Sequence, residues 1–195
     1  MAEGSESDGS AADSAADAPG VAARDDLAGV VDLFGWLTRA ELARALSELA
    51  FKRRTEVDGD AIAAAIDVAV AEYALVPAPP EALDEEGDGS TAVADPDDGV
   101  DADEVAFAVG PAAFPSLPEG ASDLPHILDV PERGVDREAL SAAVLARLSE
   151  DAVAAIRDGD ADRLAVLADV TYDIEAWAPV DAGDIRERIV AELDS

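Results

Sequence analysis

The side chains of this sequence that could do acid–base or metal chemistry are almost all carboxylates. The chain carries 45 Asp and Glu residues in 195 positions, so pairs of acids three or four residues apart arise often by chance. A catalytic acid–base pair is recognised by pocket geometry and a shifted pKa, and spacing along the chain reveals neither of these. The sequence therefore identifies no catalytic residue.

The only histidine, His126, lies between Asp123 and Asp129 in the segment DLPHILD. These groups could form a catalytic or metal site, but we favour a histidine of a connecting segment that bonds to nearby backbone. A single histidine excludes multi-histidine centres, and a chain without cysteine has no thiolate ligand or disulfide. Motifs of the types GxxxxGK[ST], GxGxxG and GxSxG are absent. We expect no metal and no cofactor.

One acidic run resembles the start of a calcium-binding loop. Asp158, Asp160 and Asp162 occupy its positions one, three and five, and Asp169 occupies position twelve. However, Arg163 stands where the loop needs glycine, and an aspartate replaces the longer bidentate glutamate. We therefore interpret the run as the end of one helix followed by the N-cap of the next.

The one cluster of basic residues is Lys52, Arg53 and Arg54, at the end of the predicted helix LTRAELARALSELAFKRR. Together with Arg39 and Arg44 of the same helix, these residues are the candidates for contact with a DNA backbone or with a partner protein. Cations are also favoured at a helix C-terminus by the helix dipole, by a few tenths of a kcal/mol to about 1 kcal/mol each. That position accounts for the cluster without any ligand.

The elements around this helix predict a winged-helix-like domain over residues 24–110. Apolar spacing indicates a first helix from Arg24 to Leu37, and Thr38 opens the second helix with a capping box. A third helix begins near Asp58 or Asp60, and short strands follow near 73–76 and 105–109. Three helices followed by two strands around a long loop is the element order of a winged helix.

The third helix argues against sequence-specific DNA binding. In a winged helix this element enters the major groove, where it needs Arg, Lys, Asn or Gln on its exposed side. Its polar residues here are Asp58, Asp60, Asp67 and Glu72. We therefore favour a non-enzymatic protein-interaction or scaffold module that binds an unknown protein, with the region of Phe34 and Trp36 as one contact surface. The alternatives are an acidic DNA-associated transcriptional regulator and, more remotely, an enzyme that uses unidentified carboxylates.

The rest of the chain divides into segments of different composition. Residues 1–23 predict a disordered acidic tail, and 78–104 a disordered acidic loop with eleven acids between Glu81 and Glu104. A proline-rich irregular connector is expected over 111–135. Residues 136–195 predict a helical subdomain. Its first helix ends at Gly159, its second spans about 161–177, and its third is capped by Asp181 or Asp184. The fold class is therefore mainly α with a small β-hairpin.

The formal net charge of -32 indicates the kind of solvent in which the protein folds more than the kind of partner that it binds. Such a charge opposes compaction at ordinary ionic strength, but molar salt shortens the screening length to roughly 3 Å. We therefore expect a salt-rich cytoplasm as the setting. The N-terminus lacks the basic start and apolar core of a signal peptide, and no apolar run is long enough to span a bilayer, so no membrane partner is expected.

Four segments of the sequence together resemble a known protein family. They are LFGWLTRAELARALSELAFKR, AIDVAVAEYALV, GPAAFPSLPEGASDLPHILDVP and DVTYDIEAWAPVDAGDIRERI. This combination resembles a haloarchaeal family known only as a domain of unknown function. The resemblance extends from about Arg24 to Leu193 without the acidic loop. It implies a salt-adapted protein and no activity, cofactor or site residue.

Overall fold

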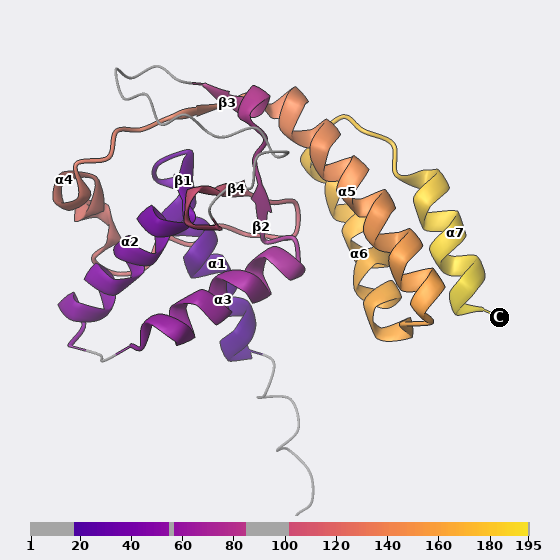
Figure 1. Ribbon diagram of the computed structural model, residues 1–195, viewed down its shortest axis with the longest axis horizontal. Helices are drawn as coiled ribbons and strands as arrows, with labels where there is room; N and C mark the ends of the chain where they lie inside the picture. The colour runs from indigo at the N-terminus through magenta and orange to yellow at the C-terminus, as the bar shows by residue number, and fades with distance from the viewer. Residues whose placement is uncertain (1–17, 55–56, 85–101, 195) are drawn as a thin grey trace, which may run out of the picture.

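The computed structural model describes residues 18–54, 57–84 and 102–194, which form a mainly helical fold with small antiparallel sheets (Figure 1). The helices are α1 (Ala18–Asp32), α2 (Arg39–Lys52), α3 (Gly59–Ala71), α4 (Leu124–Leu128), α5 (Arg137–Asp158), α6 (Ala161–Trp177) and α7 (Gly183–Leu193). The strands are β1 (Trp36–Thr38), β2 (Leu75–Pro77), β3 (Leu83–Asp84), β4 (Ala106–Val109) and β5 (Gly134–Val135). Single 3-10 turns are η1 (Pro80–Ala82), η2 (Ala102–Glu104) and η3 (Ala121–Asp123).

Local capping chemistry sets the ends of α2 and α3. The Thr38 hydroxyl accepts from the Glu41 amide at 3.2 Å, and the Thr38 amide donates to Glu41 Oε2 at 2.9 Å. This confirms the predicted capping box, which satisfies two amides that the first helical turn leaves unpaired. Asp58 caps α3 by accepting from the Asp60 amide. Both helices therefore begin where the sequence predicts.

A three-stranded antiparallel sheet in the order β1-β4-β2 separates two hydrophobic cores. Its register pairs Trp36 with Ala108, Leu37 with Phe107 and Leu75 with Val109. Because neighbouring strand residues point to opposite faces, each face belongs to a different core. The face toward α1, α2 and α3 contains Leu37, Leu75 and Phe107. The other face contains Trp36, Val76, Ala106 and Ala108, in one cluster with the C-terminal helices.

The sheet contains one strand more than the predicted two-stranded hairpin, because β1 also pairs with β4. The first helix ends at Asp32 rather than continuing to Leu37, which lies in β1. Gly35 turns the chain with φ 82, and a Cβ there would lie 1.9 Å from the Arg133 carbonyl oxygen. The apolar spacing of Leu37 fitted a helix, but pairing with the distant strand β4 prevails over that local preference.

The C-terminal helices α5, α6 and α7 form the second lobe of the molecule (Figure 1). Asp136 caps α5 by accepting from two amides, and α5 ends at Asp158, followed by its C-cap Gly159, whose φ is 66. Asp160 then caps α6 through the Arg163 amide. These boundaries confirm the predicted ends of α5 and α6 and the cap interpretation of the calcium-like run. The predicted cap of the last helix is wrong, because the N-cap residue of α7 is Ala182 rather than Asp181 or Asp184.

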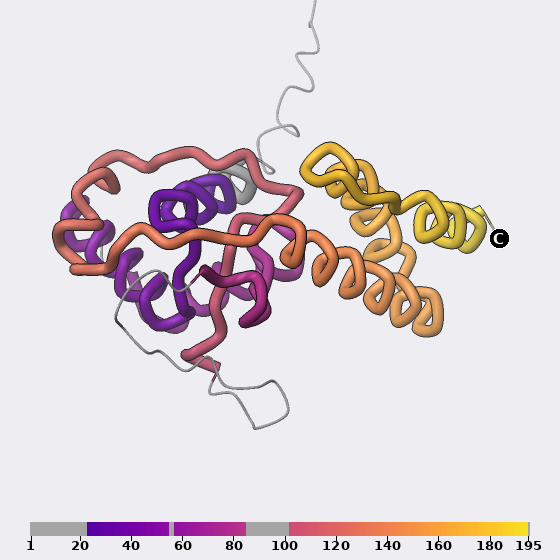
Figure 2. Tube along the Cα trace, turned by 90° about the horizontal axis from the view of Figure 1, so that it is seen from above, coloured from indigo at the N-terminus to yellow at the C-terminus, as the bar shows by residue number. Residues whose placement is uncertain are grey.

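The segment between β4 and α5 runs out along the N-terminal lobe to α4 and returns to α5 (Figure 2). It is more ordered than the irregular connector predicted for 111–135, because it contains η3, α4 and β5. Strand β5 pairs with β3, which places Leu83 opposite Val135. The connector approaches α1 closely at Gly29. A Cβ at this position would lie 2.0 Å from the Ser116 carbonyl oxygen, so the approach requires glycine.

Two segments predicted to be disordered are partly structured. Residues 18–23 of the predicted tail belong to α1, and residues 1–17 lie outside the described residues. Within the predicted loop 78–104, the described residues form η1, β3 and η2, while 85–101 lie outside the description. Backbone pairing of β3 with β5 explains the order at the start of this loop, and the acidic composition gave no sign of it. Among the described residues, no helix combines the length and apolar character needed to cross a bilayer.

Candidate functional site

The basic cluster at the end of α2 is held by the connector. Lys52 Nζ lies 3.1 Å from Asp123 Oδ2 and 3.3 Å from the Gly120 carbonyl oxygen. The Arg53 guanidinium donates to the Glu119 carbonyl oxygen at 3.3 Å. Two of the three clustered cations therefore fasten the segment 119–123 to the C-terminus of α2.

The other predicted contact residues are spread over the surface of α2. Arg39 forms an ion pair of 2.5 Å with Asp67 of α3, and its guanidinium carbon lies 5.5 Å from the centre of the Phe107 ring. Arg44 is exposed, and within the described part of the chain it makes no hydrogen bond or ion pair. Arg54 is exposed and follows α2 with φ 55. The five residues thus combine paired cations with separate exposed ones.

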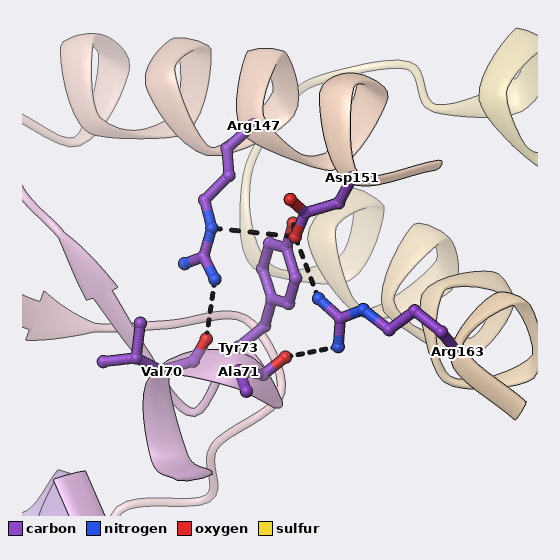
Figure 3. Close-up of polar contacts among 6 residues, drawn as sticks. All are labelled: Val70, Ala71, Tyr73, Arg147, Asp151 and Arg163. Carbon is purple, nitrogen blue, oxygen red and sulfur yellow. Dashed lines mark hydrogen bonds and ion pairs between the residues drawn. The ribbon is translucent and has the colours of Figure 1, made fainter. Parts of the chain in front are cut away.

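The most extensive polar cluster lies where α3 meets the C-terminal helices (Figure 3). The hydroxyl of the fully buried Tyr73 donates to Asp151 Oδ2 at 2.8 Å. The guanidinium carbons of Arg147 and Arg163 lie 4.4 Å and 5.8 Å from the centre of the Tyr73 ring. Burial, followed by the hydrogen bond to Asp151, raises the pKa of Tyr73, so the phenol keeps its proton.

The same two arginines cap the carbonyl end of α3. Arg147 donates to the Val70 carbonyl oxygen at 2.9 Å, and Arg163 donates to the Ala71 carbonyl oxygen at 2.6 Å. Cations at this end also interact favourably with the helix dipole. Arg163 further donates to Asp151 at 2.8 Å. Tyr73, Asp151 and the two arginines therefore join α3 to α5 and α6, and the cluster is a polar junction between the lobes.

A second polar cluster joins β1, α2 and the connector. Arg133 donates to both carboxylate oxygens of Glu41 at 2.7 Å, and its guanidinium carbon lies 4.0 Å from the centre of the Trp36 ring. Burial alone would raise the pKa of Glu41, but hydrogen bonds from Arg133 and the Thr38 amide outweigh it and hold the pKa below its usual range. Trp36 and Phe34 are buried. The expectation that their region forms an exposed contact surface for a partner protein is therefore wrong.

The remaining candidates for chemistry do not converge. His126 is exposed on α4, and within the described residues it makes no hydrogen bond to backbone or carboxylate. Asp158 pairs with the neighbouring Arg157 at 2.9 Å. Across residues 18–54, 57–84 and 102–194, no group of three or more His, Asp or Glu side chains could hold a metal ion.

Sequence reasoning missed the arginines that organise both clusters. Arg133, Arg147 and Arg163 lie far along the chain from the aromatic rings that they contact. The signal that could have revealed these arginines is the scarcity of basic residues, since the chain has 13 Lys and Arg against 45 Asp and Glu. In such a composition, an arginine on a helix beside core positions is a candidate for a buried partner.

Comparison with curated proteins and with solved structures found no match. Comparison with protein families found one whose model spans nearly the whole of the two lobes, from the start of the α1 core to the end of α7. The chain belongs to this family, described as a family of unknown function (DUF7109), which it matches over residues 25–194.

Proposed function

We propose that the protein is a non-enzymatic protein-interaction module whose N-terminal lobe is winged-helix-like. Helices α1, α2 and α3 followed by the antiparallel pair β2 and β4 support the winged-helix part of this proposal. The proposed setting is a salt-rich cytoplasm, in which a chain of net charge -32 is screened.

The composition of the exposed side of α3 carries the proposal. Its exposed residues are Gly59, Asp60, Ala61, Ala63, Ala64, Asp67, Val68 and Ala71. None of these side chains can donate a hydrogen bond to a base edge, and the two carboxylates would repel phosphate. Small apolar side chains instead suit close contact with another protein surface.

The pairing of the basic residues points the same way. Arg39 is neutralised by Asp67, and Lys52 by Asp123. A DNA-binding face needs cations that are free to displace counterions from phosphate. Exposed Arg44 and Arg54 remain as separate charges on different parts of the lobe.

Affinity capture in molar KCl tests the proposal against the DNA alternative. The tagged full chain is compared with its Lys52→Gln/Arg53→Gln/Arg54→Gln variant in cell extracts, each with and without nuclease. We expect both chains to retain the same proteins after nuclease treatment. Retention that nuclease removes, and that the triple variant lacks, would replace the interaction module with a DNA-associated regulator.

A further inference from the structure

An apolar groove opens where α1, the end of α2 and the first half of α3 meet. Its volume is about 270 Å³, and the described residues that line it are ten apolar residues, the acid Asp26 and the cation Arg53. Its walls include Leu27 of α1, Leu46 of α2 and Ile62 of α3. Because these helices also hold the core of the lobe, the fold itself forms the groove.

The exposed part of this lining is poor in charge. Among the described residues, the exposed ones that line the groove are Ala23, Arg53, Val57 and Ala61, and none of them is acidic. Acids make up nearly a quarter of the whole chain, 45 of 195 residues, so exposed surface without acids is uncommon in this protein. Exposed apolar surface that is depleted of charge is typical of the centre of a protein–protein interface.

A second exposed apolar side chain lies beside the groove. Leu117 is 52% exposed and directly precedes the lining residue Pro118. Its segment is fixed to α1, because the Ser116 amide donates to the Asp25 carbonyl oxygen at 3.0 Å. Val57, which lines the groove, is 45% exposed. One surface of the lobe therefore presents both projecting aliphatic side chains and a hollow that could receive such side chains.

The charge of the lining favours a partner surface that is itself neutral. Asp26 and Arg53 cancel in net charge, so a partner with excess positive charge gains little at this groove. Arg53 donates to the Glu119 carbonyl oxygen through one guanidinium nitrogen, and a guanidinium has five N–H donors, so it can also bind a carboxylate. A complementary partner places a carboxylate at Arg53, a cation at Asp26 and apolar groups between them.

A second copy of the chain meets these requirements by symmetry. In a two-fold dimer the same patch faces itself, so a residue that contacts another residue across the interface is contacted by it in return. Asp26 of each copy then faces Arg53 of the other copy. Val57 and Leu117 of each copy likewise face the groove of the other. The match needs no further partner, because both halves of each contact are already on this surface.

The C-terminal lobe leaves the groove accessible, and the size of the groove sets the strength of the association. Helix α3 lines the groove with Ala61, Ile62 and Ala65, whereas Arg147 and Arg163 of the C-terminal lobe contact its other end. The lining has twelve described residues, fewer than the roughly 20–30 residues on each side of a standard interface. A dimer formed here is therefore weak and depends on protein concentration.

We infer that two copies of the chain associate through this groove in a two-fold dimer, held by apolar contacts and by two reciprocal pairs of Asp26 with Arg53. The inference goes beyond the proposed function and does not depend on another partner protein. High salt favours the dimer, because screening removes the repulsion between two chains that each carry a net charge of -32. Lower salt therefore weakens this association, whereas it would strengthen binding of a positively charged partner.

Sedimentation velocity of the full chain in molar KCl, followed over a wide range of protein concentration, tests the dimer. Val57→Asp places a charge in the proposed interface, and Val68→Asp makes the same change at a valine that is 50% exposed and does not line the groove. We expect Val57→Asp to weaken dimerisation at least about tenfold and Val68→Asp to leave it unchanged. Ala61→Trp, which fills the groove, should act like Val57→Asp.

A charge exchange tests the reciprocal pairs. At the lowest salt at which the chain remains folded and dimeric, Asp26→Arg and Arg53→Asp should each weaken self-association, because each brings like charges together twice. An equal mixture of the two variants should dimerise as the wild type does, since both pairs are then restored across the interface. Asp60→Arg makes the same change of charge at an exposed residue outside the lining, and it should not weaken the dimer.

The outcomes separate this inference from the proposed function. A folded wild type that stays monomeric at every concentration, or a dimer that survives both Val57→Asp and Ala61→Trp, overturns the inference. A mixture of the two charge variants that associates no better than either alone overturns the two-fold arrangement. Dimerisation without any protein captured from extracts would support the groove contact and count against the proposed function. Captured proteins with a monomeric chain would do the reverse.

Discussion

The Tyr73 hydroxyl donates a hydrogen bond of 2.8 Å to the Asp151 carboxylate, which joins the turn after α3 to the middle of α5. Arg163 of α6 donates to the same carboxylate oxygen. The contact between the lobes is therefore directional and polar, in addition to the apolar cluster that runs from the sheet to the C-terminal helices.

Tyr73→Phe removes this hydrogen bond and should lower the free energy of unfolding by about 1.5–3 kcal/mol, the range for a bond to a charged group. The pKa of Tyr73 is raised in the folded chain, so its contribution is fully present below the unfolded pKa of about 10 and is lost as pH rises beyond it. Denaturant unfolding of both chains between neutral and alkaline pH measures the difference. A difference that grows above pH 10 would contradict the assignment.

Glu41→Gln tests the second cluster in acid. The pKa of Glu41 is lowered in the folded chain, so its contribution is present above the unfolded pKa of about 4.3 and is lost as pH falls through the folded pKa. We expect a loss of about 1–2 kcal/mol near neutral pH, reduced by partial solvent screening, and convergence of the two chains in acid. Glu138→Gln, at an exposed carboxylate of α5, is the control and should change little.

Gly35→Ala should destabilise the chain more than Gly159→Ala. Both glycines have positive φ, which costs an alanine roughly 1–2 kcal/mol. At Gly35 a Cβ would also lie 1.9 Å from the Arg133 carbonyl oxygen, whereas at Gly159 no atom lies within 4 Å. Thermal unfolding of the two variants compares these costs, and equal losses would show that the connector yields easily at Arg133.

The triple change of Lys52, Arg53 and Arg54 to glutamine should cost less than about 1 kcal/mol for each residue, because exposed ion pairs contribute little. Leu42→Ala, at a fully buried position of the same helix, should cost about 2–5 kcal/mol. Urea unfolding in constant salt compares both chains with the wild type. A larger loss from the triple variant would mean that the fastening of segment 119–123 is central to the fold.

The chain should lose cooperative structure when salt is removed. It has 45 acids against 13 bases, and the screening length rises from roughly 3 Å in molar salt to about 10 Å at a tenth of that concentration. Far-UV circular dichroism and thermal melting across a KCl series measure the effect. An unchanged melting profile at low salt would contradict the salt-adapted interpretation of the composition.

Local chemistry allowed the sequence alone to predict most helix boundaries and the mainly helical fold class. The Thr38 capping box, the Asp136 N-cap and the glycine at 159 act over a few neighbouring residues, so their effect is visible in the chain itself. The five basic candidates were also found from the sequence, but their partners were not. Lys52 and Arg53 contact residues 119–123, which only the course of the connector brings near.

Tertiary structure alone decided the features that depend on distant pairing. Trp36 and Leu37 form a strand because β4 pairs with them, although their spacing also fits a helix. The junction between Tyr73 and Asp151 and the groove beside Ile62 likewise require elements that lie far apart in sequence. The local preferences of each segment are compatible with several arrangements. Tertiary packing and the burial of apolar surface decide which distant segments come into contact.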